Sequence, residues 1–194
     1  LLQGRHRGIL STLLVADGLP ICGMVCHQRA VQGQTPSARW VGLISVADVN
    51  ADSAAVTAAG GKVVYAPVML GARGETAVFK DPEGVLFGVV HSKNGDPLDY
   101  AGDLNEWYWV DLWTADVEKA ATFYRAAIGY ETSPVADDGP RSGVRLLSGG
   151  FARAGIMQKN SEKSSATWLP YIRVADAKAA AAAARAAGGK VLLD

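Results

Sequence analysis

Four side chains with ligand-binding chemistry alternate along the segment from Trp107 to Thr114. Successive residues of a strand point to opposite faces, so every second side chain shares a face. The side chains that share one face here are Trp107, Trp109, Asp111 and Trp113. Indoles offer stacking area and a carboxylate accepts hydrogen bonds, a combination suited to a flat, partly apolar organic ligand. The alternative is that the tryptophans fill a closed core.

A second segment, "WLPYIRVAD" ending at Asp176, offers further groups. Leu169, Tyr171 and Arg173 alternate in the same way, and the guanidinium can orient a ligand by charge or hydrogen bond. The alternative is that Arg173 and Asp111 pair with each other or with nearby backbone. Both segments are therefore candidates for a ligand-binding site, and no catalytic residue is assigned. The predicted site residues are Trp109, Asp111, Trp113, Tyr171 and Arg173.

The elements that must position these residues are repeated in the chain. "VADVNADSAAVTAAGGKV" begins at Val46 and "VADAKAAAAAARAAGGKV" begins at Val174, 128 residues apart, and Trp40 and Trp168 keep the same offset. A fixed offset of this length indicates a repeated domain instead of a solenoid repeat. The sequence therefore predicts two domains in tandem.

Each copy follows one order of elements. A strand precedes an aspartate that can cap a helix, an Ala-rich helix follows, and a glycine pair ends it before extended structure resumes. The C-terminal helix, Ala177 to Ala187, has little bulk and is expected to lie close against a sheet. Asp81-Pro82-Glu83-Gly84 fits a type I turn, which predicts a hairpin.

A third segment after Asp116 shows the same order. Its helix has one apolar face at helical spacing, formed by Ala120, Phe123, Tyr124 and Ala127. The pattern predicts an α+β fold of four βαβββ units, the first without its strand and helix and the fourth without its last strands. We expect a first domain at 1–91, a linker at 92–106 and a second domain at 107–194.

The composition favours a globular protein and argues against several partners. Apolar residues make up 49% and charged residues 20%, and 19 basic side chains balance 19 acidic ones, so nucleic acid is not expected. No apolar run is long enough to span a bilayer and no signal peptide is evident, which favours the cytoplasm. Cys22 and Cys26 would lie about 13 Å apart on a strand, too far for a disulfide, and are expected to be free thiols.

These units resemble the glyoxalase, bleomycin-resistance protein and extradiol dioxygenase superfamily, also called vicinal oxygen chelate. The motifs that carry the resemblance are "DLWTADVEKAATFYRAAIGYE", "YIRVADAKAAAAAARAAGGKV" and "FKDPEGVLFGVV". The resemblance implies paired βαβββ modules that form two cupped half-barrel sheets with the helices outside. It also implies a ligand inside each cup, often with a divalent metal on its floor, and it puts Trp109 at a position that faces the cup.

The metal positions of the family can be counted onto this chain. They fall on Val41, Trp109, Leu169, Gly88, Cys22 and Ala154. Only the Cys22 thiol among these side chains can coordinate a metal ion. The histidines His6, His27 and His91 are expected to be exposed or hydrogen-bonded, so no metal ligand is predicted. The inward residues of the first cup are expected to be small or aliphatic, namely Val41, Leu43, Ser45, Leu86 and Gly88.

The resemblance and the residues together lead to one functional prediction. The protein binds a small organic molecule without a cofactor, in sequestration or resistance, and whether it is an enzyme is left open. The alternatives are a metal-dependent lyase, isomerase or dioxygenase with a divalent cofactor, and a structural protein with both cups filled. A small-molecule ligand is the expected partner, with no membrane, and a homodimer is left open.

Overall fold

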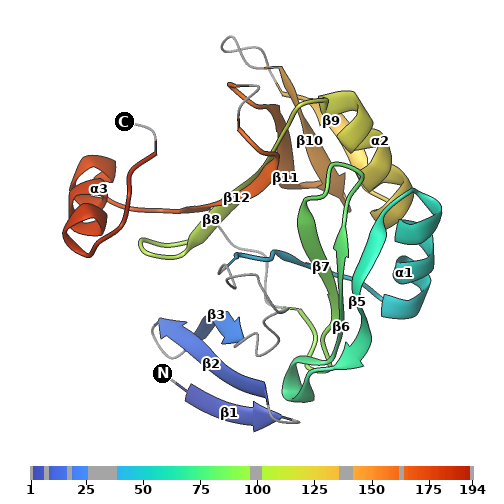
Figure 1. Ribbon diagram of the computed structural model, residues 1–194, viewed down its shortest axis with the longest axis horizontal. Coiled ribbons are helices and arrows are strands. Elements are labelled where there is room, and N and C mark those ends of the chain that lie inside the picture. The colour runs from blue at the N-terminus through green and yellow to red at the C-terminus, as the bar shows by residue number, and fades with distance from the viewer. Residues whose placement is uncertain are drawn as a thin grey trace, which may run out of the picture.

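The computed structural model describes residues 2–6, 9–16, 19–25, 39–96, 102–135, 142–161 and 164–192, in an α+β fold (Figure 1). The first part of the chain forms β1 (Leu2–His6), β2 (Ile9–Ala16), β3 (Leu19–Val25), β4 (Leu43–Ser45), α1 (Val49–Ala58), β5 (Lys62–Met69), the 3-10 turn η1 (Gly71–Arg73), β6 (Glu75–Lys80) and β7 (Leu86–His91). The second part forms β8 (Trp107–Thr114), α2 (Val117–Ile128), β9 (Glu131–Pro134), β10 (Gly143–Ser148), β11 (Phe151–Gln158), β12 (Thr167–Ile172) and α3 (Ala177–Ala186).

The strands form three sheets, and two of them share one topology. The β4–β7 sheet has the order β4-β7-β6-β5, and the β8–β12 sheet has the order β12-β8-β11-β10-β9. In both, the first strand of a βαβββ unit lies parallel to the last strand, β4 beside β7 and β8 beside β11. Both sheets thus contain the βαβββ order of elements, from β4 to β7 and from β8 to β11. β12 extends the second of these sheets by pairing antiparallel with β8.

The predicted aspartate caps begin all three helices. Asp48 accepts hydrogen bonds from the backbone N–H groups of Asn50 and Ala51 at 2.8 and 3.0 Å. Asp116 caps α2 and Asp176 caps α3 in the same way. These side chains bind N–H groups that have no partner within the helix, which fixes where each helix leaves its strand.

The predicted turn after β6 is also formed. The backbone N–H of Gly84 donates to the Asp81 carbonyl at 2.9 Å, and the Asp81 carboxylate accepts from Glu83 N and Val85 N at 3.0 and 2.9 Å. Gly84 has a φ of 89°, which side-chain-bearing residues rarely adopt. The turn joins β6 and β7 into the expected hairpin.

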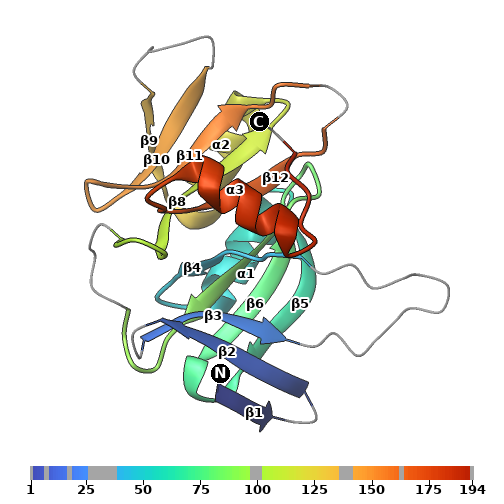
Figure 2. The ribbon, with the colours of Figure 1, turned by 90° about the vertical axis from the view of Figure 1, so that its left-hand side faces the viewer.

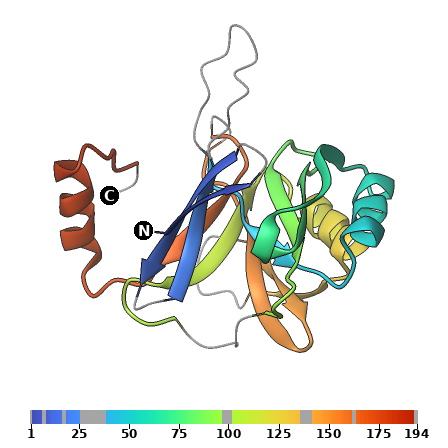
Figure 3. The same ribbon diagram turned by 90° about the horizontal axis from the view of Figure 1, so that it is seen from below.

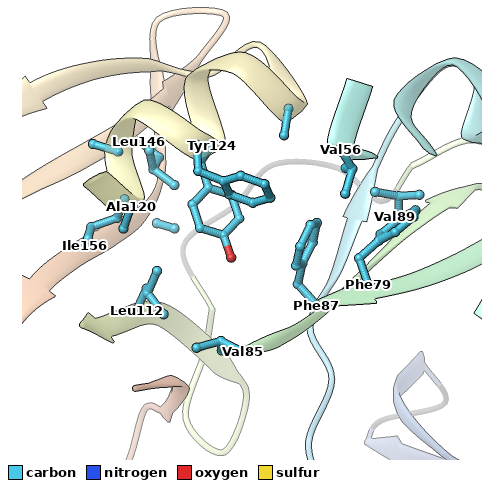
Figure 4. Packing of buried hydrophobic residues seen from close by; sticks show 14 of the residues in the cluster. Val56, Phe79, Val85, Phe87, Val89, Leu112, Ala120, Tyr124, Leu146 and Ile156 are labelled. Atoms are coloured by element: carbon cyan, nitrogen blue, oxygen red, sulfur yellow. The ribbon is translucent and has the colours of Figure 1, made fainter. Parts of the chain in front are cut away.

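One hydrophobic core is shared by the two whole units (Figure 4). Phe87 of β7 makes edge contacts with Phe123 and Tyr124 of α2, with ring centroids 6.0 and 5.4 Å apart. The face of α2 predicted to be apolar is buried throughout, at Ala120, Phe123, Tyr124 and Ala127. The helices α1 and α2 lie side by side on the outside of the two sheets (Figure 1).

The remaining elements lie apart from this core. The β1–β3 sheet faces the side of the β4–β7 sheet that α1 does not cover (Figures 1 and 2). α3 extends away from the three sheets, and none of its residues is buried (Figure 3). The expectation that this helix lies against a sheet is therefore wrong for the described residues, because its alanines offer little apolar area to hold it there. No helix among the described residues has the length and apolar character of a membrane span.

Candidate ligand-binding site

The β8 strand divides its side chains between two faces as its alternation predicts. Leu112 and Thr114 are fully buried on the side of the core. Trp109 donates from its indole Nε1 to Asp111 Oδ1 at 2.7 Å, which requires these two side chains to share the opposite face. We call this opposite face of the β8–β12 sheet, turned away from α2, the open face.

The register of the strands places a row of residues across the open face. Asp111 pairs with Leu169 of β12 on one side and with Gly155 of β11 on the other, and Gly155 pairs in turn with Arg145 of β10. Strands lie about 4.8 Å apart, so the backbones of Asp111 and Arg145 are about 10 Å apart. A carboxylate and a guanidinium therefore flank a glycine.

Gly155 has a specific role in this row. A Cβ atom added at Gly155 would overlap Asp111 Oδ1. Glycine thus lets the carboxylate lie flat over the neighbouring strand, where the Trp109 indole holds it. Arg145 is exposed and forms no hydrogen bond or ion pair within the described chain.

The predicted aromatic residues flank this row. Trp113 pairs with Thr167 and Met157, and Tyr171 lies opposite Trp109. All four of Trp109, Asp111, Trp113 and Tyr171 are partly exposed. Trp109, Trp113 and Tyr171 do not belong to the buried core of the described residues. A closed core filled by the tryptophans would have required them to be buried.

Arg173 lies outside this group. The β8–β12 register shifts between Tyr171 and Ile172, and the Arg173 guanidinium donates to the Gly102 carbonyl at 3.1 Å. Its backbone also pairs with Glu106. The structure therefore brings four of the five predicted site residues together and holds Arg173 by backbone, as the weighed alternative expects. Arg145, which the sequence pattern did not indicate, is a cation on the open face, and the register of β10 against β11 is the signal that identifies it.

A bulge also corrects one of the counted positions. Leu146 pairs with Ala154 but Leu147 pairs with Ala152, so β11 carries one extra residue. Ala154 therefore faces the core, where it is 5% exposed, and Gly155 takes its place on the open face. The β2–β3 pair carries the same irregularity, with Leu14 opposite Cys22 and Val15 opposite Pro20. By this equivalence Gly23, not Cys22, corresponds to Gly155.

The donor groups do not fit a metal centre. No three His, Cys, Asp or Glu side chains gather as a cation site in the part of the chain that the structure describes. Gly155 and Gly88 have no side chain, Leu169 offers no lone pair, and the Trp109 nitrogen donates to Asp111. His91 is exposed, with Nδ1 3.1 Å from the Val46 carbonyl oxygen. His27 and Cys26 lie outside the described residues, and the side chain of His6 is not described.

A buried hydrogen-bond chain positions β12 beside β8. The Trp168 indole donates to the Tyr124 hydroxyl at 3.1 Å, and that hydroxyl donates to Asp81 Oδ2 at 3.3 Å. Burial raises the pKa of Tyr124 well above its ordinary value and also raises the pKa of Asp81. Because Trp168 is fixed on the core side, its neighbours Leu169 and Thr167 are turned to the open face.

The fold of the chain resembles that of a solved structure. A solved fusion of a xylose isomerase-like TIM barrel with a 4-hydroxyphenylpyruvate dioxygenase matches 96% of this chain and 34% of its own, with 19% identity and a TM-score of 0.51. That likeness and the two βαβββ sheets define a vicinal-oxygen-chelate fold. No family model matches the chain.

Curated relatives share part of their sequence with this chain. CFP32 of Mycobacterium tuberculosis, named as a glyoxylase, is 29% identical over 85% of this chain and 62% of its own length. The anthracycline biosynthesis protein DnrV of Streptomyces peucetius is 32% identical over 61% of this chain and 46% of its own. The chain thus spans less than two thirds of these relatives. The names of these relatives and the fold support the glyoxalase, bleomycin-resistance protein and extradiol dioxygenase superfamily.

Proposed function

We propose that the protein binds a small planar organic molecule on the open face of the β8–β12 sheet, without a metal ion, and sequesters it. The tandem organisation at 1–91 and 107–194, the cytoplasmic location and a homodimer belong to the same proposal. The residues that contact the ligand are Trp109, Asp111, Trp113, Tyr171 and Arg145.

The observation that carries the proposal is the fixed carboxylate at Asp111. Trp109 donates to Oδ1 at 2.7 Å, which leaves the other carboxylate oxygen to accept a hydrogen bond from a ligand. Gly155 provides a floor without a side chain next to it. The indoles of Trp109 and Trp113 supply aromatic surface on both sides of that position.

The two charges select the polar groups of the ligand. A hydroxyl or ammonium group at one end of the ligand would donate to Asp111. An acceptor or acidic group at its other end would bind Arg145, whose backbone lies about 10 Å from that of Asp111. A flat ring system between them would cover Gly155. This geometry fits a fused aromatic ligand better than a short aliphatic one.

The names of the relatives agree with a ligand of this class. Two relatives are named as anthracycline biosynthesis proteins, and an anthracycline is a fused, hydroxylated ring system. A glyoxylase name suggests the alternative of a metal-dependent enzyme. The side chains at the family's metal positions offer too few lone pairs for that alternative.

Titration of the 194-residue chain with the anthracycline daunorubicin tests the proposal. We expect saturable quenching of tryptophan fluorescence in the presence of a chelator. Asp111→Asn keeps one acceptor but loses the charge, and it should weaken binding about ten-fold, since a hydrogen bond to a charged group contributes about 1.5–3 kcal/mol.

The matched control is Asp103→Asn, an exposed carboxylate that precedes β8. It should leave the affinity unchanged. Equal affinity of Asp111→Asn and the parent would contradict the proposed site. Binding that requires an added divalent ion and disappears with the chelator would favour the metal-dependent alternative.

A further inference from the structure

Two polar side chains, Arg73 in η1 and Thr76 in β6, have no hydrogen-bond or ion-pair partner among the described residues. Thr76 of β6 is 4% exposed, and its Oγ1 has no hydrogen-bond partner among the described residues. The guanidinium of Arg73, three residues earlier, is partly buried and forms no hydrogen bond or ion pair within the described chain. A buried hydroxyl without a partner is unfavourable, so its retention points to a ligand.

Both groups point to the same side of the β4–β7 sheet. The neighbours of Thr76 face α1: Glu75 accepts from the Asn50 side chain of α1 at 3.5 Å, and Ala77 lies in the core. Thr76 therefore faces the opposite side, where the β1–β3 sheet lies (Figure 2). Arg73 reaches the same region, because a Cβ atom added at Gly23 of β3 would overlap its guanidinium.

The loop that carries Arg73 is held in place by its own backbone. Leu70 N donates to the Gly74 carbonyl at 2.9 Å, and Arg73 N donates to the Leu70 carbonyl at 3.2 Å. Gly74 has a φ of 101°, and a Cβ atom there would overlap the His91 carbonyl oxygen. The position of Arg73 is thus built into the loop, and Gly23 leaves room for its side chain.

We propose that Arg73 and Thr76 form a second binding site, between β3 and β6, for the carboxylate of a small apolar organic acid. The guanidinium offers two parallel N–H donors to a carboxylate, and the Thr76 hydroxyl donates to one of its oxygens. Val68 and Val90, the cross-strand neighbours of Thr76, provide apolar surface for the body of the acid. This site is separate from the open face of the β8–β12 sheet.

Amide and arginine-side-chain NMR of the full 194-residue chain tests this site with three probes. Benzoate carries both a carboxylate and an apolar ring, inorganic phosphate carries only the anion, and benzyl alcohol carries only the ring. Benzoate should shift the Gly23 and Thr76 amides and the Arg73 side-chain signal in a saturable way. Phosphate and benzyl alcohol should bind at least about ten-fold more weakly.

Two variants connect the signals to the residues. Arg73→Gln should weaken benzoate binding at least about ten-fold, and Thr76→Val, which keeps the side-chain shape, should weaken it several-fold. The matched control is Arg125→Gln on the exposed side of α2, which should bind benzoate like the parent. Unchanged signals of the α2 core residues check that each variant is folded.

Three results would overturn the proposal. The absence of a saturable benzoate shift at Gly23 or Thr76 would exclude binding at this site. Equal benzoate affinity in Arg73→Gln and the parent would exclude the guanidinium as the binding group. Phosphate that binds as tightly as benzoate would exclude an organic acid as the ligand class.

Discussion

Gly155 controls how Asp111 can present its carboxylate on the open face. Its missing side chain leaves the space that Asp111 Oδ1 occupies, and the Trp109 indole holds the carboxylate there at 2.7 Å. Arg145 supplies a positive charge on β10, two strands away from Asp111. In the proposed site, ligand recognition depends on a few side chains and one glycine.

Gly155→Ala tests whether ligand affinity depends on the position of the Asp111 carboxylate. The added methyl group displaces the Asp111 carboxylate from the indole, so daunorubicin affinity should fall about ten-fold, which corresponds to about 1.4 kcal/mol. Gly42→Ala is the control, because no atom lies within 4 Å of a Cβ added there. Fluorescence titration compares the two variants, and equal affinities would contradict the role of Gly155.

Two buried threonines give opposite predictions for stability. Thr76 has no partner for its hydroxyl among the described residues, whereas the Thr114 hydroxyl donates to the Glu83 carboxylate. Thr76→Val should raise the free energy of unfolding by about 1 kcal/mol, and Thr114→Val should lower it by about 1–3 kcal/mol. Urea unfolding measures the free energy of unfolding of both variants. Equal destabilisation of Thr76→Val and Thr114→Val would contradict the claim that the Thr76 hydroxyl is unpaired.

At the scale of elements, the turn between β6 and β7 connects the two whole units. Asp81 accepts from the turn backbone and from Tyr124 of α2, and Glu83 accepts from Thr114 and from the Ala115 N–H at 3.3 Å. The same Tyr124 hydroxyl holds Trp168 of β12. A turn in the first unit thus helps to position the strand that completes the open face.

The buried Asp81 carboxyl gives this turn a pH dependence. Burial raises its pKa in the folded protein, so the folded state binds the proton more tightly than the unfolded state does. The contribution of Asp81 to stability is therefore fully present below its unfolded pKa, about 4, and is lost as the pH rises through the raised folded value.

Asp81→Asn removes this titration while keeping an acceptor for the turn. Relative to the parent, the variant should gain stability as the pH rises from about 4 to 7, and the raised pKa of Asp52 cancels because both proteins share it. Urea unfolding at a series of pH values measures the difference. A difference that stays constant or changes in the opposite direction would refute the account of Asp81.

The sequence predicted elements better than it predicted their contacts. Caps at Asp48, Asp116 and Asp176 and the turn at Asp81 are local features, so their residues identify them directly. The displacement of Arg173 and the replacement of Ala154 by Gly155 arise from single-residue register shifts. Alternation cannot show where a strand carries an extra residue, so positions counted beyond a bulge move to the other face.

At the scale of the whole molecule, the two whole units share one core. Phe79 and Phe87 of the first unit pack with Phe123 and Tyr124 of the second, and α1 lies against α2. The linker at 92–106 stays a prediction, and the buried side chains on either side of it form a single cluster. α3 contributes no buried residue to this cluster.

A shared core predicts that the two units lose stability together. Phe87→Ala should lower the free energy of unfolding by about 3–5 kcal/mol and reduce hydrogen-exchange protection in β6 and β10 alike. Phe151→Ala is the control, because Phe151 is 62% exposed and its loss should cost little. Loss of protection in β6 with β10 unchanged would show that the units unfold independently.

Native mass spectrometry of the purified chain tests the central claim most directly, because it reports metal and organic ligand in one spectrum. We predict that the parent binds daunorubicin with no metal ion attached, and that Asp111→Asn loses most of the complex at the same concentration. One equivalent of tightly bound nickel, zinc, iron or manganese per chain, required for the complex and removed by a chelator, would contradict the claim.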